Sequence, residues 1–207
     1  MFTDRADAGR QLAHLLSHYQ TAKPVIIGLP RGGVPVAREV ADALRAPLDV
    51  IVVRKLGVPG HEEFAFGALS EDNVLVIDHN TVAEVGMTQM HIDAVVAEQR
   101  KELDRRLALI RKRHTQVELK GRVVIIIDDG VATGTDAKAA CRVARGRGAA
   151  KVVLATPVAP SDWRSRLGRE ADVLLAVLED PDFVAVGAYY EEFGQTTDEQ
   201  VLEALHA

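Results

Sequence analysis

The stretch VVIIIDDGVATGTD, residues 123–136, decides the fold of this chain of 207 residues and indicates its chemistry. Residues 121–128 contain a continuous β-branched run, which is typical of a strand that is covered on both faces. The run ends in Asp128 and Asp129, and a turn rich in glycine and threonine then opens a helix. Such a turn directs backbone N–H groups and hydroxyls outward at a helix N-terminus, which favours a phosphate. The two carboxylates beside it can accept hydrogen bonds from sugar hydroxyls.

Two common phosphate-binding patterns do not fit this stretch. The interval from Gly130 to Gly134 is wrong for a P-loop, and no lysine follows it. The glycine spacing of the dinucleotide-binding fingerprint is missing as well. The remaining alternative is a strand-to-helix turn in which an aspartate only caps the helix.

Strand and helix patterns alternate along most of the chain, which predicts an α/β fold with a parallel sheet and helices on both faces. The predicted strands are residues 23–30, 47–57, 73–79, 121–128, 151–158 and 171–178. The predicted helices are residues 5–20, 33–46, 88–114, 135–145 and 161–170. Residues 57–72 contain several glycines and acids, which favours a long mobile loop or ribbon. In a parallel sheet of this kind, ligands bind at the carboxyl ends of the strands.

Composition and charge bound the class of protein. The length fits one domain, and 47% hydrophobic with 27% charged residues is typical of a soluble globular protein. The lack of a long apolar run and of an apolar N-terminal signal core predicts a cytoplasmic protein with no membrane partner. A net charge of −5 argues against nonspecific nucleic-acid binding. The single cysteine, Cys141, excludes a disulfide framework and predicts a small apolar residue on a helix face.

The Asp-Asp pair and the Thr-Gly-Thr turn resemble the phosphoribosyl pyrophosphate (PRPP) motif of type I phosphoribosyltransferases. In that family the two acids hold the ribose 2′ and 3′ hydroxyls, and the turn binds the 5′-phosphate. The resemblance gives Asp128 and Asp129 the first role. It gives the second role to Val131, Ala132, Thr133, Gly134 and Thr135.

The resemblance also implies the architecture. It implies one phosphoribosyltransferase domain over residues 1–207, with a Rossmann-like core over about residues 23–180. A small hood is expected from the N- and C-terminal segments, about residues 1–20 and 181–207.

A second segment that fits the same family is Gly28-Leu29-Pro30-Arg31-Gly32-Gly33. The family places its pyrophosphate loop after the first core strand, and that loop often contains a cis peptide bond that does not precede proline. The matching bond in this chain is Pro30–Arg31. The resemblance makes Arg31 a source of charge and Gly32 and Gly33 sources of backbone amides. A plain strand-to-helix turn is the alternative.

Arg54 and Lys55 form a third segment of this chain that fits the same family. In the adenine and orotate enzymes an Arg-Lys pair stands ahead of a flexible loop that closes over the substrate. The resemblance implies that Arg54 and Lys55 bind the leaving pyrophosphate and that residues 56–70 exclude water. Within this loop, Glu63 is the candidate to act with Lys55 in catalysis, and Glu62 and His61 stay open. A solvated loop is the alternative.

The acceptor site is matched least well. Phe183 and Val184 resemble a segment of the hypoxanthine-guanine enzymes, in which an aromatic ring stacks on the base, although Phe183 as a core residue is the alternative. Those enzymes carry an acid where this chain has Ala132, and a lysine near Thr156-Pro157-Val158. The identity of the acceptor therefore stays open.

The resemblance implies an enzyme that moves a phosphoribosyl group from PRPP to a nitrogen nucleophile and releases pyrophosphate. The acceptor is expected to be a nucleobase or related heterocycle, as in purine or pyrimidine salvage. Mg²⁺ is expected on pyrophosphate and ribose oxygens, with Asp129 contributing through water. A homodimer is left open. The alternatives are a regulator that senses PRPP or a nucleotide, and a hydrolase or phosphatase that uses Asp128 and Asp129 but lacks an obvious nucleophile.

Overall fold

The computed structural model describes residues 1–206, apart from the side chain of Glu63. Five parallel strands form the main sheet in the order β2-β1-β6-β7-β8, which confirms the predicted fold class. Apolar strand residues are buried along most of this sheet because helices cover both of its faces. The strands are β1 (Val25–Gly28), β2 (Leu48–Val50), β6 (Val123–Ile127), β7 (Lys151–Pro160) and β8 (Val173–Asp180).

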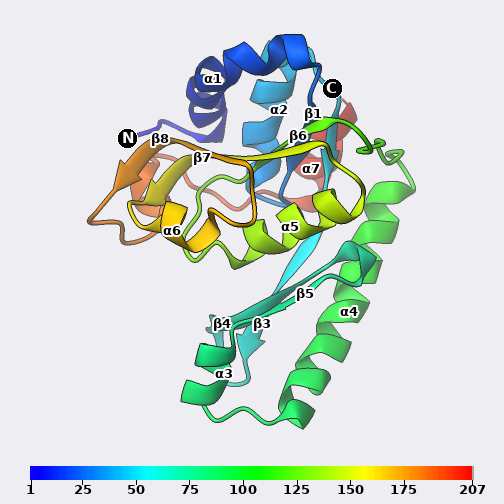
Figure 1. Ribbon diagram of the computed structural model, residues 1–207, viewed down its shortest axis with the longest axis vertical. Helices are drawn as coiled ribbons and strands as arrows, with labels where there is room; N and C mark the ends of the chain where they lie inside the picture. The colour runs from blue at the N-terminus through cyan, green and yellow to red at the C-terminus, as the bar shows by residue number, and fades with distance from the viewer. Residues whose placement is uncertain (207) are drawn as a thin grey trace.

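The helices divide between the two faces of the main sheet (Figure 1). One face carries α1 (Arg5–Leu16), α2 (Gly33–Leu44) and α7 (Asp198–His206), and the other carries α5 (Thr135–Gly146) and α6 (Trp163–Leu167). The helix predicted over residues 5–20 continues from α1 into the 3₁₀ helix η1 (Ser17–Ala22). Another 3₁₀ helix, η3 (Val186–Tyr189), follows β8. Helix α6 is shorter than the prediction over residues 161–170, and α7 was not predicted.

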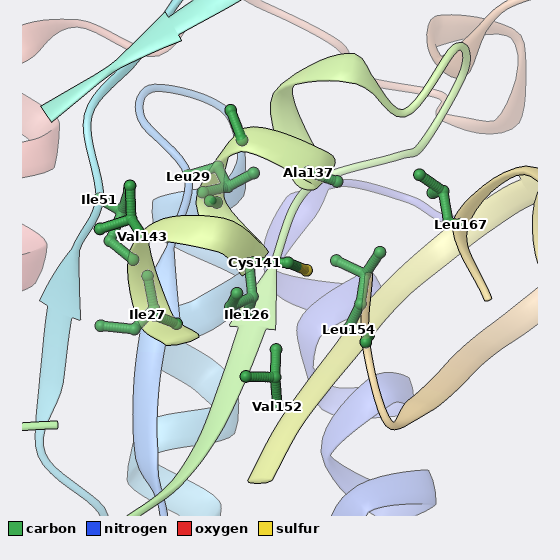
Figure 2. Close-up of a cluster of buried hydrophobic side chains, with 14 of the residues drawn as sticks. Ile27, Leu29, Ile51, Ile126, Ala137, Cys141, Val143, Val152, Leu154 and Leu167 are labelled. Carbon is green, nitrogen blue, oxygen red and sulfur yellow. The ribbon is translucent and has the colours of Figure 1, made fainter. Parts of the chain in front are cut away.

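Figure 2 shows the apolar core between α5 and the main sheet, where Cys141 lies beside Ile126 and Leu154. The Cys141 side chain is fully buried, and burial raises the pKa of its thiol to about 12. The prediction of a small apolar residue on a helix face is therefore confirmed. Leu167 brings α6 into the same cluster.

A second sheet differs from the prediction. Strands β3 (Val53–Val58), β4 (His61–Ser70) and β5 (Leu75–Ile77) pair antiparallel in the order β3-β4-β5. The single strand predicted over residues 47–57 is wrong, because β2 and β3 belong to different sheets. Of the loop or ribbon predicted over residues 57–72, the structure shows the ribbon, because β4 occupies most of this segment and pairs with β3. Gly60, with a φ of 79°, makes a tight turn between β3 and β4, so the glycine here marks a hairpin.

The second sheet packs against α4 (Gln89–Arg111) and is followed by α3 (His79–Glu84). Thr88 caps α4 as predicted, because its hydroxyl accepts a hydrogen bond from His91 N at 3.3 Å. Phe66 of β4 and Ile92 of α4 belong to one buried apolar cluster. These elements form a projecting lobe, residues 53–111, that extends away from the main sheet (Figure 1). None of the helices within residues 1–206 combines the length and apolar character that a membrane span needs.

Glu71, in the 3₁₀ helix η2 (Glu71–Asn73), binds the backbone between β2 and β3, where the chain leaves the main sheet. Its side chain is 2% exposed. Its carboxylate accepts a hydrogen bond from Val52 N at 2.8 Å and pairs with Arg147 Nη2 at 2.7 Å. Arg111, at the end of α4, lies 3.9 Å from the same carboxylate. The placement of the projecting lobe therefore depends on a buried charge and its two cations.

We predict that Glu71→Gln lowers the free energy of unfolding by about 2–4 kcal/mol, because Arg147 and Arg111 lose a buried anionic partner. Urea unfolding measures the change. The matched control is Glu84→Gln at an exposed position of α3, where a change within about 0.5 kcal/mol is expected. An equal loss in both variants would contradict the role of Glu71.

Candidate functional site

The segments that follow β1 and β6 meet at one edge of the main sheet. Gly28 of β1 and Ile127 of β6 are register partners, and Leu29 N donates to Ile127 O at 2.9 Å. A Cβ atom on Gly32 would lie 2.0 Å from Asp129 Oδ2. The approach therefore excludes any side chain at Gly32 in this arrangement. Two motifs that the sequence offered separately are in direct contact.

Residue Gly33 makes the second close approach of this loop. A Cβ atom there would lie 2.6 Å from Ile127 O and 2.8 Å from Asp128 Cα. The peptide bond Pro30–Arg31 is cis, as the resemblance implied. The loop after β1 thus lies flat against the end of β6.

Asp128 and Asp129 are held in a partly enclosed position. Burial raises the pKa of Asp128 well above its usual range, and the negative charges of Asp129 and Asp136 raise it further. Asp128 Oδ1 accepts a hydrogen bond from Asp129 N at 2.9 Å. Burial also raises the pKa of Asp129, although Arg5 opposes this effect.

The partner of Asp129 is Arg5, a residue that no sequence pattern singled out. Arg5 Nε lies 2.7 Å from Asp129 Oδ2, and both side chains are nearly buried. Arg5 Nη1 donates to Gly194 O at 2.7 Å, and the guanidinium lies 4.1 Å from the centre of the Phe193 ring. Tyr190 Oη donates to the backbone oxygen of Asp129 at 2.5 Å. Both ends of the chain therefore reach the acid pair.

The predicted phosphate turn opens α5. The Val131 side chain is buried, and the backbone N–H of Val131 donates to Val158 O at 2.9 Å. Ala132 and Thr133 are exposed. The hydroxyls of Thr133 and Thr135 lie 3.3 Å apart. The N–H of Val131 is therefore committed to the fold, and Ala132 and Thr133 are the members of the turn that face solvent.

Gly134 has a φ of 78°, and a Cβ atom there would lie 2.6 Å from Leu167 Cδ1. A side chain at Gly134 would therefore strain the backbone and clash with Leu167. A cavity of about 370 Å³ adjoins the turn. Its polar and charged lining includes Asp78, His79, Asn80, Thr133, Thr135, Lys138 and Arg166.

Arg54 and Lys55 lie on β3, in the projecting lobe. Arg54 Nη2 donates to Gln99 Oε1 of α4 at 2.8 Å. Burial raises the pKa of Asp136 at the start of α5, and the charges of Lys55 and Arg54 lower it. The two cations of β3 therefore face the helix that the phosphate turn opens.

A cavity of about 420 Å³ lies between the β3-β4 hairpin and α4, with Arg54, Lys55 and Glu62 in its lining. His61 and Glu62 are exposed at the hairpin tip. Hydrogen bonds from the backbone N–H groups of Glu62 itself and of Gly60 lower the pKa of Glu62. The side chain of Glu63 lies outside the described part of the chain.

Phe183 and Val184 differ in their surroundings. The Phe183 ring stacks on Tyr189 with 5.5 Å between ring centres and packs against a buried cluster that includes Phe2. Val184 is 86% exposed. Phe193, 39% exposed beside Arg5, is a second aromatic ring near the acid pair, and no sequence signal pointed to it.

A family model described as "phosphoribosyl transferase domain" matches residues 4–191. Two curated proteins of Mycobacterium tuberculosis, from strains H37Rv and CDC 1551, are each 49% identical to the chain over 205 residues. Their names give phosphoribosyl transferase as a provisional assignment. The match covers 99% of this chain and 46% of each relative, so the chain spans about half the length of these curated relatives.

Solved structures agree with this fold. The crystal structure of TT1426 from Thermus thermophilus has a TM-score of 0.82 and 42% identity, and the match covers 99% of this chain and 97% of that chain. A purine phosphoribosyltransferase from Pyrococcus horikoshii has a TM-score of 0.51 and 18% identity, with 95% and 97% covered. At that identity the second match shows the fold alone.

We predict that Asp128→Asn stabilises the fold at pH 7 by about 0.5–2 kcal/mol, because it removes a buried charge. The raised pKa means that, above about pH 3.8, the native state binds the proton of Asp128 more tightly than the unfolded chain does, so ionisation of Asp128 costs the native state stability. The stability of the parent therefore falls as pH rises through this range, and the advantage of the variant disappears as pH falls towards 3.8.

Urea unfolding of both proteins between pH 4 and pH 8 measures this difference. The control is Asp104→Asn at an exposed position of α4, where no pH-dependent gain is expected. A gain for Asp128→Asn that does not change with pH would show that Asp128 is not held by burial in the way described.

Proposed function

We propose that this chain, which belongs to the phosphoribosyl transferase domain family, moves a 5-phosphoribosyl group from PRPP to a nitrogen nucleophile. The observation that carries the proposal is the contact between the loop at Gly32 and the acid at Asp129. It brings a loop suited to pyrophosphate and a carboxylate pair suited to ribose hydroxyls to one edge of the sheet. PRPP carries both groups on one sugar, together with a 5′-phosphate.

Each part of PRPP has a matching set of residues in this proposal. Asp128 and Asp129 accept hydrogen bonds from the ribose hydroxyls. The turn binds the 5′-phosphate through N–H groups and hydroxyls, with the exposed Ala132 and Thr133 together with Gly134 and Thr135. The pyrophosphate group is bound by the cations Arg31, Arg54 and Lys55 and by the amide of Gly32. The N–H of Gly33, which the sequence also singled out, donates to Leu29 O at 3.0 Å, so Gly33 contributes by keeping the loop close to β6.

In the transfer step, the bond between C1 of the ribose and the pyrophosphate oxygen breaks, and a nitrogen of the acceptor bonds to C1. Arg31, Arg54 and Lys55 stabilise the negative charge that develops on the leaving pyrophosphate. The β3-β4 hairpin closes over the site and keeps water from the ribosyl cation. Glu63, on this hairpin, is the proposed carboxylate that stabilises the cation or moves a proton.

Magnesium fits the donor set at this edge of the sheet. Mg²⁺ prefers oxygen ligands and is bound by one or two carboxylates together with substrate phosphates and water. Asp128 and Asp129 supply two adjacent carboxylates, and the described residues hold no group of three or more His, Cys, Asp or Glu side chains suited to a metal. When bound, the ion would neutralise charge on the pyrophosphate, and Asp129 is the residue that would hold it through water.

The proposed acceptor is a nucleobase or a related heterocycle, held near Phe183 and Val184. The half-buried Phe183 ring offers a flat apolar surface, and the exposed Val184 offers backbone groups. Because the curated relatives are about twice as long as this chain, the activity proposed here is that of one domain. A regulator that binds PRPP without turnover is the rival, and turnover with an acceptor distinguishes the two.

We predict that Asp128→Asn and Asp129→Asn each weaken PRPP binding by about 1.5–3 kcal/mol, because a charged acceptor of the ribose hydroxyls is lost. Calorimetry with PRPP and Mg²⁺ measures the affinity, and unfolding curves show whether each variant is folded. Binding as tight as that of the parent in both folded variants would leave the acids as a structural cap.

We also predict that replacing residues 57–63 with a short Gly/Ser link keeps PRPP affinity within about tenfold, or 1.4 kcal/mol. The same change is expected to reduce transfer by about 10²-fold or more, because the site no longer excludes water. Calorimetry gives the affinity, and pyrophosphate release across a panel of bases and small amines gives the transfer rate. Equal turnover with and without the hairpin tip would refute its catalytic role, and PRPP binding with no turnover on any acceptor would favour the regulator.

A further inference from the structure

Arginines from three separate parts of the chain gather beside the loop that follows β1. Arg31 lies in that loop, Arg54 lies on β3, and Arg106 lies on α4. Burial lowers the pKa of the Arg106 guanidinium, the charge of Asp198 opposes this effect, and the positive charges of Arg54 and Arg31 lower the pKa further. Arg106 is therefore close enough to both Arg31 and Arg54 for their positive charges to repel its own.

Asp198, the first residue of α7, is the carboxylate that faces this group. Its Oδ1 atom lies 3.9 Å from Arg31 Nη1 and 3.8 Å from Arg106 Nε. Its Oδ2 atom lies 3.7 Å from Arg105 Nη2. Charge-assisted hydrogen bonds between nitrogen and oxygen are about 2.7–2.9 Å long, so Asp198 faces three cations without a close hydrogen bond to any of them.

Glu102, the neighbouring acid on α4, is already committed to Arg105. Its carboxylate accepts hydrogen bonds from Arg105 at 2.7 and 2.9 Å, and this contact lowers the pKa of Glu102 to about 2. Its contact with Arg106 is made at Nη2, at 3.4 Å. Within residues 1–206, the buried Nε of Arg106 has no hydrogen-bond partner, and the side chain is 11% exposed. Arg31 and Arg106 thus share one carboxylate that hydrogen-bonds to neither.

Space and helix capping both allow Asp198 to leave this position. A cavity of about 340 Å³ opens beside Arg31 and Asp198, and Arg113 also lines it. Helix α7 is capped by Thr197, whose hydroxyl accepts a hydrogen bond from Gln200 N at 3.1 Å and whose N–H donates to the Gln200 side chain at 2.8 Å. Asp198 can therefore turn towards the cavity while the N-terminus of α7 stays capped.

We propose that Arg106 binds the pyrophosphate group together with Arg31, and that the Asp198 carboxylate occupies this position until the group arrives. The inference rests on the proposed function and adds a binding residue and an internal competitor to it. A diphosphate offers several charged oxygens, so it can make the close hydrogen bonds that one carboxylate does not make to both arginines. Pyrophosphate binding then releases the contact between the start of α7 and α4.

A purely structural role for the same cluster gives a different expectation. If Asp198 only tied α7 to α4, its removal would destabilise the fold and leave the affinity for pyrophosphate unchanged or weaker. If it competes with pyrophosphate, its removal increases that affinity. The sign of the change therefore separates the two roles.

The experiment is calorimetry with inorganic pyrophosphate and Mg²⁺, and separately with PRPP, on the parent and on three variants. Arg106→Gln is expected to weaken pyrophosphate binding by at least tenfold. Lys101→Gln removes the same charge from an exposed position of the same helix and is expected to stay within twofold of the parent. Asp198→Asn is expected to tighten pyrophosphate binding by about three- to tenfold, with PRPP affinity following in the same direction.

Thermal unfolding shows which variants are folded. If Arg106→Gln does not fold, the pyrophosphate affinity of Asp198→Asn alone tests the proposal. Pyrophosphate affinity within twofold of the parent in folded Arg106→Gln would overturn the role of Arg106. Unchanged or weaker binding in Asp198→Asn would overturn the competition. If the parent binds neither PRPP nor pyrophosphate, the proposed function itself is refuted. If the parent binds both and the variants bind them equally well, only the roles of Arg106 and Asp198 are refuted.

Discussion

The close approach of Gly32 and Gly33 to the end of β6 is the constraint on which the arrangement of the site depends. A Cβ atom at either position would overlap atoms of Asp129 or of the backbone at Ile127, so the loop after β1 can lie flat only with glycine there. That approach is possible because β1 and β6 are neighbours in the parallel sheet. The order of the strands, and not the sequence spacing, therefore brings the two motifs together.

Enclosing the carboxylates of Asp128 and Asp129 costs stability, and residues near the two ends of the chain reduce this cost. Burial raises the pKa of both adjacent carboxyl groups, and the negative charge of Asp129 raises the pKa of Asp128 further. Arg5 reduces this cost at Asp129 through a contact of 2.7 Å, and Tyr190 fixes the backbone of the same residue. Active sites commonly give up stability in this way to keep charged groups ready for a ligand.

The sequence predicts best what is decided locally. The β-branched run at residues 121–128, the Thr88 cap and the apolar position of Cys141 each depend on neighbours in the chain, and each prediction is confirmed. The break between β2 and β3 was not predicted because the contacts made there come from residues distant in the sequence. Val52 N donates to the Glu71 carboxylate, which in turn pairs with Arg147. Arg5 and Phe193 left no local signal, since their role depends on the two ends of the chain meeting beside Asp129.

The two ends of the chain bring opposite charges to the two sides of this site. Near the N-terminus, Arg5 neutralises an acid proposed to hold ribose, and in the C-terminal helix Asp198 faces the arginines proposed to hold pyrophosphate. The site without a ligand is thus internally paired, which lessens the repulsion that like charges would otherwise exert on each other. A ligand with hydroxyls on one side and a diphosphate on the other competes with both contacts at once. A simple anion competes only with Asp198, so pyrophosphate alone would leave the contact between Arg5 and Asp129 in place.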